Sequence, residues 1–235
     1  MLDRPATRGP HPAVVIGHGS GRVLKEDQGE LATAFLNIGY AVLRYDKRGV
    51  GESGGIYSGV GTVNSATMFP VLAGDMAAAA RHLRTLRGID PQGVGFAGVS
   101  QAGWIIPVAL TMAPEATFGV ILSGPTVSVG LEIYYSDLAE HGTVSPANAE
   151  ARLADYRGPH GFDPLPYLEQ LEVPVLWLFG AEDRSIPTKR SVEILTALAR
   201  DQRRFKWAVY PEAGHRLDLM TVWPDVRSWL TELAR

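Results

Sequence analysis

Short apolar runs alternate with amphipathic stretches along almost the whole chain. The runs predict strands at 13–18, 41–45, 93–99, 118–123, 175–179 and 205–210. Between them, apolar positions recur at helical spacing, which predicts helices within 31–38, 71–87, 131–141, 146–156, 188–200 and 221–234, and another directly after residue 100. Strands that alternate with helices are typical of a parallel sheet covered on both faces. We therefore predict a single α/β domain over 1–235, built on six mainly parallel strands.

Glycine and proline mark two departures from this regular pattern. The Gly- and Ser-rich segment 47–70 predicts a long loop after the second strand, with the next helix beginning at Val71. Pro107 lies in the helix that follows residue 100. It has no N–H to donate to the Gly103 carbonyl, which predicts a kink in that helix.

The composition excludes several classes of function. The 235 residues carry 22 basic and 25 acidic side chains, a net charge of −3 that gives no sign of binding to nucleic acid or an anionic membrane. The chain has no cysteine, which excludes disulfides, thiolate catalysis and cysteine-based zinc sites. His11, His82, His141 and His160 lack metal-ligand spacing with nearby acids, so we expect neither a metal nor an organic cofactor.

The N-terminal residues contain no apolar segment typical of a signal peptide. No apolar run approaches the roughly 20 residues that cross a bilayer. We therefore expect a soluble, cytoplasmic protein without a membrane span, present as a monomer or a homodimer.

A serine at the end of a predicted strand carries the strongest chemical signal. The segment Gly98-Val99-Ser100-Gln101-Ala102-Gly103 joins the strand at 93–99 to an apolar helix. Small residues around Ser100 fit a sharp strand-to-helix turn, which would expose its hydroxyl at the amino end of that helix. In the strict Gly-x-Ser-x-Gly pattern the fifth residue is glycine, and Ala102 stands there instead. Ser100 is the candidate nucleophile.

An aspartate and a histidine follow two later strands. Asp183 comes shortly after the strand at 175–179, and His215 shortly after the strand at 205–210. The order serine, aspartate, histidine at strand ends is one of the known arrangements of the serine triad. His215 is then the candidate base, and Asp183 the candidate group that orients it.

Two other acidic residues compete for the role of Asp183. Glu182 is its neighbour and is expected to point away along the turn. Asp218 lies too close after His215 for the usual topology of this arrangement. We therefore assign the role to Asp183.

A second glycine-rich turn is placed to help stabilise an oxyanion. The strand at 13–18 runs into His18-Gly19-Ser20-Gly21. The backbone N–H groups of Ser20 and Gln101 are the candidate donors, and Gly21 is the alternative to Ser20 because the register of the turn is open. We expect His18 to support the turn rather than to act in catalysis.

Together these motifs resemble those of the α/β-hydrolase family, most closely its bacterial esterase, thioesterase and serine-peptidase-like branch. The resemblance is carried by residues 18–21, 45–53 (Tyr-Asp-Lys-Arg-Gly-Val-Gly-Glu-Ser), 98–103, 180–183 and 214–215. It implies the α/β-hydrolase fold, and it implies that Asp46 and Arg48 brace the turn near the oxyanion donors.

The resemblance also implies two architectural features. This fold normally opens with an antiparallel hairpin, and too few residues precede Ala13 to form one, so we expect the N-terminal hairpin to be missing. Residues 125–170 exceed one crossover helix, and we expect them to form a small helical lid insertion over the serine. The candidate substrate contacts are Trp104, Ile133, Tyr134, Tyr135 and Leu138. Packing alone is the alternative for these side chains.

The sequence therefore predicts a serine hydrolase whose partner is a small-molecule acyl ester. It would cleave carboxylic esters of short to medium acyl length through an acyl-enzyme intermediate. Thioesters are a close alternative, because the chemistry is the same. A peptidase is less favoured, since the peptidases of this branch carry a large gating domain that these residues do not encode. The remaining alternatives are a small-ligand receptor with slow turnover, and a lyase or perhydrolase that reuses the triad.

Overall fold

The computed structural model describes residues 1–200 and 204–234. Its centre is a seven-stranded sheet in the order β1-β3-β2-β4-β5-β6-β7. The strands are β1 (Leu2–Asp3), β2 (His11–Ile16), β3 (Ala41–Leu43), β4 (Ile89–Val99), β5 (Gly119–Leu122), β6 (Val175–Gly180) and β7 (Phe205–Tyr210). Every neighbouring pair is parallel except β1 with β3. The predicted α/β architecture is confirmed.

The sheet has one strand more than the six predicted. The additional strand is β1, which pairs antiparallel with β3 at the edge of the sheet. The Met1 ammonium donates to the Arg44 carbonyl oxygen at 2.8 Å, and the Arg44 guanidinium pairs with Asp3 Oδ2 at 2.5 Å. A two-residue strand shows no period in a sequence, so only these contacts reveal it. A single short strand thus covers this edge of the sheet.

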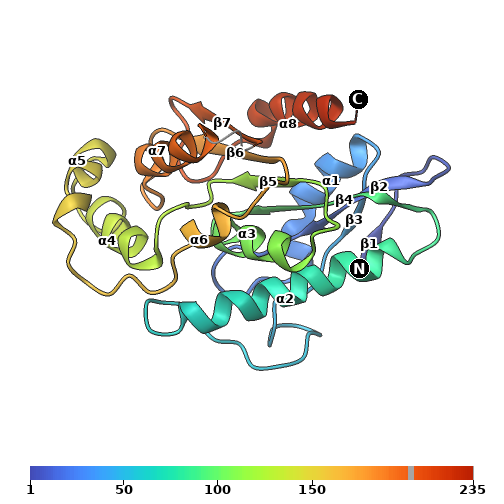
Figure 1. Cartoon of the computed structure of the whole chain (residues 1–235), viewed down its shortest axis with the longest axis horizontal. Coiled ribbons are helices and arrows are strands. Elements are labelled where there is room, and N and C mark those ends of the chain that lie inside the picture. The colour runs from blue at the N-terminus through green and yellow to red at the C-terminus, as the bar shows by residue number, and fades with distance from the viewer. Residues whose placement is uncertain (201–203, 235) are drawn as a thin grey trace.

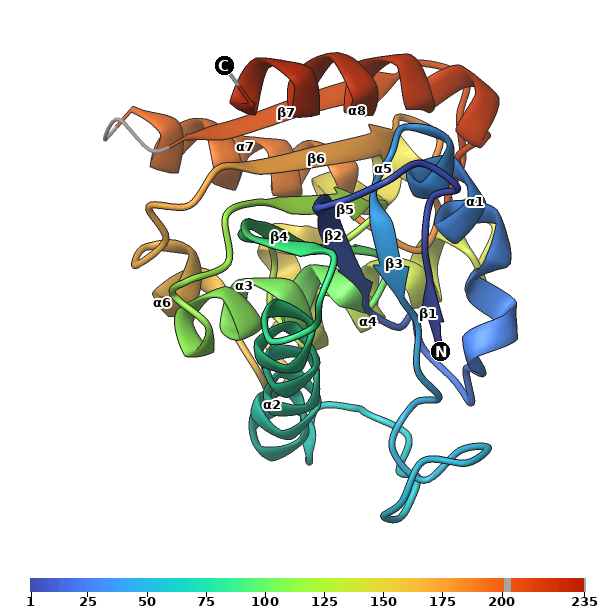
Figure 2. The ribbon, with the colours of Figure 1, turned by 90° about the vertical axis from the view of Figure 1, so that its right-hand side faces the viewer.

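Helices pack on both faces of the sheet (Figures 1 and 2). The α-helices are α1 (Gly29–Asn37), α2 (Ser65–Arg84), α3 (Ala102–Met112), α4 (Val129–Ala139), α5 (Pro146–Ala151), α6 (Leu165–Leu168), α7 (Thr188–Ala199) and α8 (Leu219–Leu233), and the 3-10 helices are η1 (Lys25–Gln28) and η2 (Leu153–Asp155). Figure 2 shows α8 above the sheet and α2 and α3 below it. Within the described ranges, no helix combines the length and apolar character that a membrane span requires.

Alternation along the strands divides the core into two layers. Val14 and Ile16 of β2 belong to a core layer that also holds residues of α1 and α8, whereas Ala13 and Val15 belong to the layer that holds residues of α2, α3 and α7. Successive side chains of a strand point to opposite faces, so both sets are buried. This two-sided burial explains why the strands read as nearly continuous apolar runs.

Helix α2 begins at Ser65, earlier than the predicted start at Val71. Its first turns carry Phe69, which is fully buried and lies with its ring centroid 5.2 Å from that of Trp104 and 5.1 Å from that of Phe162. Pro70 lies inside the helix, where proline costs about 3 kcal/mol. Burial of a phenylalanine contributes about 1.5–3 kcal/mol, which offsets most of that cost. Tertiary packing therefore overrides the local signal for a loop.

The segment 125–170 is mainly helical, as predicted. Helix α4 covers the predicted helix at 131–141, and α5 followed by η2 covers the one at 146–156. Figure 1 places α4 and α5 together at one end of the molecule. They share a small core of their own, formed by Tyr135, Ala139, Ala149 and Leu153. The role of this segment as a lid stays a prediction.

Candidate active site

Ser100 occupies a constrained turn at the carboxyl end of β4. Its φ is 58°, in the left-handed region that residues with a side chain rarely adopt. The Ser100 N–H donates to the Leu122 carbonyl oxygen at 2.9 Å, and the Gly103 N–H donates to the Ser100 carbonyl oxygen at 2.8 Å. A backbone conformation of this kind costs about 1–3 kcal/mol and is found mainly at functional sites. The surrounding chain thus holds Ser100 at the start of α3.

Two glycines allow this turn to pack closely. A Cβ atom at Gly103 would lie 2.6 Å from the carbonyl carbon of Gly124, and one at Gly98 would overlap the Cβ atom of Ala102. Ala102 is fully buried, and its methyl group fills the space beside Gly98. Local packing therefore accommodates the departure from the strict Gly-x-Ser-x-Gly pattern.

His215 and Asp183 meet at the carboxyl ends of β6 and β7. His215 Nδ1 lies 2.9 Å from Asp183 Oδ2. Asp183 is fully buried, and its Oδ1 accepts from the backbone N–H groups of Ser185 and Ile186, both at 2.8 Å. Three hydrogen bonds thus fix the carboxylate in one orientation. The structure brings together the two residues that the sequence pairs.

The competing acids lie elsewhere. Glu182 is exposed. Asp218 caps the amino end of α8, where it accepts from the Met220 N–H at 3.1 Å and the Thr221 hydroxyl at 2.7 Å. Neither carboxylate bonds to His215.

The Ser100 hydroxyl and the His215 imidazole form no hydrogen bond with one another in the part of the chain that the structure describes. The imidazole is held through Nδ1, and the side chain is 33% exposed. Catalytic hydrogen bonds are often long before substrate binds and shorten in the complex. Asp183 therefore orients His215 in this structure, and we expect the hydrogen bond between His215 and Ser100 to form when substrate binds.

The turn after β2 packs against Ser100. A Cβ atom at Gly19 would lie 3.9 Å from the Cβ atom of Ser100. The backbone N–H groups of Ser20, Gly21 and Gln101 donate to no acceptor among the described residues. The predicted donors thus flank the candidate nucleophile with unused N–H groups, and the choice between Ser20 and Gly21 stays open.

His18 supports this turn. It is 2% exposed, and its Nε2 lies 2.7 Å from the Tyr45 carbonyl oxygen. Burial lowers the pKa of His18 from 6.5 to about 4, so the ring is neutral at pH 7. A neutral ring with its proton on Nε2 donates to that carbonyl. His18 therefore ties the turn to the chain just after β3.

Charged side chains fix the loop that follows β3. Asp46 accepts from the backbone N–H groups of Glu52 and Lys25, both at 2.8 Å, and these bonds lower the pKa of its carboxyl to about 2. Arg48 forms an ion pair with Asp75 of α2. Both contacts hold the loop in place, and the described hydrogen bonds of Asp46 and Arg48 do not include Ser100.

Lys47, between these two residues, is marked by no signal in the sequence. It is 2% exposed, and its Nζ donates to the Gly19 carbonyl oxygen at 2.9 Å and to Gln101 Oε1 at 2.7 Å. Burial lowers the pKa of Lys47 to about 8. A lysine in a glycine-rich loop is expected in solvent, so only the fold reveals its contact with both candidate oxyanion segments.

A sequence model of the prolyl oligopeptidase family matches residues 29–225, a range that holds Ser100, Asp183 and His215. The chain belongs to the prolyl oligopeptidase family. Membership confirms the resemblance to the esterase and peptidase-like branch of the α/β-hydrolases, and it makes the protein a hydrolase.

Three similarities place this prolyl oligopeptidase family member among known proteins. An uncharacterized protein of Mycobacterium tuberculosis is 27% identical over 234 residues, covering 96% of this chain and 72% of that protein. The human acylamino-acid-releasing enzyme is 24% identical over 222 residues, covering 91% of this chain and 30% of the enzyme. The structure of Est1E from Butyrivibrio proteoclasticus with ferulic acid bound is 19% identical, with a TM-score of 0.69 over 100% of this chain and 94% of that one. The structural likeness confirms the predicted fold.

Trp104 is a packing residue in this family member. It is 5% exposed in the main core, its ring stacks on Phe69, and its Nε1 donates to the Val127 carbonyl oxygen at 2.8 Å. The indole N–H therefore has a partner already. Of the two interpretations that the sequence left open for Trp104, the structure favours packing over substrate contact.

The predicted contacts on α4 separate into two groups. Tyr135 is 1% exposed, and its hydroxyl donates to the Asp183 carbonyl oxygen at 2.6 Å, which anchors α4 beside the candidate site. Ile133, Tyr134 and Leu138 are only half-buried. Tyr135 thus joins the predicted lid segment to the acid loop, and the other three stay candidate substrate contacts.

Glu132 adds an unusual carboxyl group to α4. Burial raises its pKa to about 8, with further contributions from the charges of Glu140 and Asp183. The side chain is therefore protonated at pH 7. Its neutral state avoids a second negative charge near Asp183.

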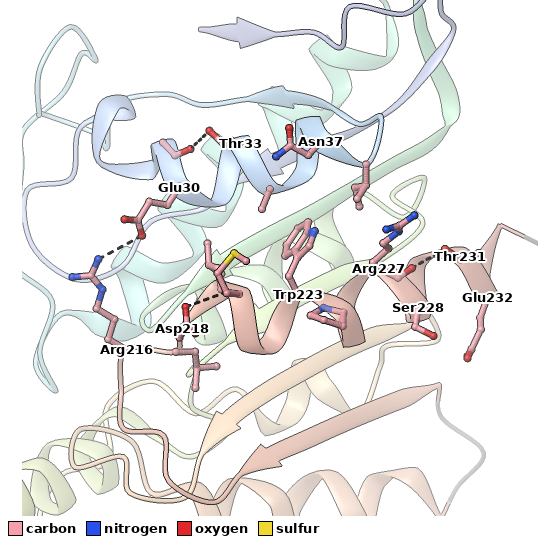
Figure 3. Close-up of a pocket in the computed structure, with 17 residues that line it drawn as sticks. Glu30, Thr33, Asn37, Arg216, Asp218, Trp223, Arg227, Ser228, Thr231 and Glu232 are labelled. Atoms are coloured by element: carbon pink, nitrogen blue, oxygen red, sulfur yellow. Dashed lines mark hydrogen bonds and ion pairs between the residues drawn. The ribbon is translucent and has the colours of Figure 1, made fainter.

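A groove of about 1320 Å³ lies between α1 and α8 (Figure 3). Trp223 projects into it from α8, and the Arg216–Glu30 ion pair lies at one end. None of Ser100, Asp183 and His215 lines it. A smaller cavity of about 400 Å³ is lined by Gly19 and Val99, the immediate neighbours of the candidate site, and by Leu217. Ser100, Asp183 and His215 do not line this cavity either, but Val99 and Arg216, which do, are chain neighbours of Ser100 and His215.

Proposed function

We propose that this hydrolase cleaves carboxylic esters of short to medium acyl length through an acyl-enzyme intermediate. The observation that carries the proposal is the 2.9 Å hydrogen bond between His215 and the buried Asp183. Both residues follow the carboxyl ends of parallel strands, on the same side of the sheet as Ser100. A serine needs a base to act as a nucleophile, and the base needs an orienting group. This chain supplies all three residue types in the order of the α/β-hydrolase triad.

In the proposed reaction, Ser100 Oγ attacks the carbonyl carbon while His215 Nε2 takes its proton. Asp183 keeps the other imidazole proton on Nδ1, so that Nε2 has a free lone pair. The N–H groups of Ser20 and Gln101 receive the oxyanion. His215 then protonates the leaving alcohol, and water activated by the same imidazole releases the acid.

The preference for a short or medium acyl group rests on a small cavity beside Val99 and, separately, on apolar side chains of α4. The neighbouring cavity of about 400 Å³ is near the lower end of the range that small-molecule sites occupy. Ile133, Tyr134 and Leu138 are the proposed apolar contacts from α4. The structure of Est1E holds ferulic acid, a carboxylic acid, on a similar fold.

Release of an N-acyl amino acid is the second candidate function. This candidate is favoured by the similarity to the human acylamino-acid-releasing enzyme, whose alignment covers 91% of this chain. The chain spans only 30% of that enzyme, so the relative supports the chemistry more than the substrate. Amide and thioester cleavage would use the same acyl-enzyme steps.

Turnover of p-nitrophenyl esters from acetate to decanoate tests the proposal. We expect hydrolysis with a maximum among the shorter chains, and Ser100→Ala should abolish it while thermal unfolding is unchanged. Ser228→Ala removes an exposed hydroxyl on α8 and serves as the matched control. Parallel assays with acyl-CoA and N-acetylalanyl p-nitroanilide compare thioesters and amides. Equal rates for Ser100→Ala and wild type would overturn the proposal, and a clear preference for the amide would replace it with the second candidate.

A further inference from the structure

Lys47 is a buried lysine without an acidic partner. No ion pair in the described part of the chain includes it. Its neighbour Asp46 is engaged by Lys25 and Glu52. Burying an ammonium group is costly unless hydrogen bonds replace its hydration. Lys47 therefore depends on the two oxygens that its Nζ contacts.

Those two oxygens belong to separate segments of the candidate oxyanion site. Gly19 O, at 2.9 Å, belongs to the peptide group whose N–H is that of Ser20. Gln101 Oε1, at 2.7 Å, belongs to the residue that supplies the second candidate N–H. One ammonium thus bridges the turn after β2 and the turn after β4.

The bridge also acts on the donor itself. The Gly19 carbonyl and the Ser20 N–H are parts of one planar peptide unit, so a bond that fixes the carbonyl fixes the direction of the N–H. A charged donor on the carbonyl oxygen also polarises that peptide and strengthens its N–H as a donor. Lys47 can therefore set both the position and the strength of the oxyanion donor without touching substrate.

We propose that Lys47 is a positioning residue that locks the two halves of the oxyanion hole together and adds positive charge behind it. The inference rests on the proposed function, because the hole has a purpose only if an acyl oxyanion forms. Lys47 lies in the segment Asp46-Lys47-Arg48-Gly49, between two residues with different partners.

The charges that surround Lys47 do not replace its role. His18, from the turn after β2, interacts with the Lys47 charge and is neutral at pH 7. Asp75 of α2 pairs with Arg48, and Asp46 pairs with Lys25. The Lys47 ammonium therefore provides the positive charge that contacts both oxyanion segments. It loses this charge above about pH 8.

Lys47→Met tests the inference, with Lys206→Met on the surface of β7 as the matched control. We expect kcat for p-nitrophenyl butyrate to fall by about tenfold to a hundredfold, less than the loss of a direct oxyanion donor, while KM stays near the wild-type value. We also expect the wild-type kcat to decline above about pH 8, where Lys47 loses its proton, and this decline should be absent in Lys47→Met. Lys206→Met should match the wild type in both.

Three results would overturn the inference. They are a kcat within threefold of wild type, an alkaline decline that persists in Lys47→Met, and a loss confined to KM. If Lys47→Met does not fold, Gln101→Met removes one end of the bridge and should lower kcat severalfold, and an unchanged kcat overturns the inference. Failure of the proposed function is distinct, because the wild-type protein would then hydrolyse no ester.

Discussion

Replacing Asp183 by asparagine should disable the candidate site while preserving the fold. The asparagine oxygen can still accept from the N–H groups of Ser185 and Ile186, which Oδ1 now binds at 2.8 Å. The amide NH₂ would then face His215 Nδ1, which in the native protein donates its proton to Asp183 Oδ2 at 2.9 Å. The imidazole would have to carry its proton on Nε2, where it cannot accept the proton of Ser100.

The size of the effect follows from this change of tautomer. The same substitution in a well-studied serine protease lowers kcat about 10⁴-fold. We expect a loss of about 10³- to 10⁴-fold here, a barrier increase of ~4–5.5 kcal/mol. The assay is turnover of p-nitrophenyl butyrate, with the midpoint of thermal unfolding measured in parallel. Glu182→Gln removes the neighbouring exposed carboxylate and is the control. The reasoning is refuted if Asp183→Asn keeps more than a tenth of the activity, or if Glu182→Gln loses as much.

Two further predictions concern stability. The pKa of His18 is 6.5 in the unfolded chain and about 4 in the folded protein, so the unfolded state binds more protons between these values. The contribution of neutral His18 to the free energy of unfolding is therefore fully present above pH 6.5, and up to ~3 kcal/mol of it is lost as the pH falls toward 4. Urea unfolding should show a smaller loss of stability over this pH range for His18→Gln than for the wild type. Equal losses in the two proteins would contradict the assignment. Gly103→Ala should destabilise by about 1–3 kcal/mol because its methyl group meets Gly124, whereas Gly74→Ala, with open space in α2, should stabilise by about 0.5–1 kcal/mol. Thermal unfolding that ranks the two variants in the opposite order would refute this packing argument.

The sequence predicts the sheet and the candidate site for a shared reason. Buried parallel strands need apolar residues on both faces, so they stand out as runs, and their carboxyl ends can be located within a residue or two. Ser100, Asp183 and His215 each follow such a run. The three residues then meet at the carboxyl ends of the strands because the strands are parallel, and the alternation of helix and strand already predicts that direction.

The features that the sequence misses depend on contacts between distant segments. Strand β1 is held by Arg44 from another part of the chain, and the start of α2 is held by rings from α3 and from the segment before α6. Lys47 looks like an exposed residue of a polar loop until the fold places it beneath Gly19 and Gln101. No periodic pattern records such pairings, because each partner lies far away in sequence.

Labelling with a fluorophosphonate, followed by peptide mass mapping, tests the central claim most directly. An activated serine attacks the phosphorus, displaces fluoride and retains the phosphonyl group, and the adduct identifies the nucleophile without knowledge of the natural substrate. The account predicts one adduct, on Ser100, that disappears in Ser100→Ala and forms far more slowly in Asp183→Asn. An unlabelled folded protein, or an adduct on a different residue, would contradict it.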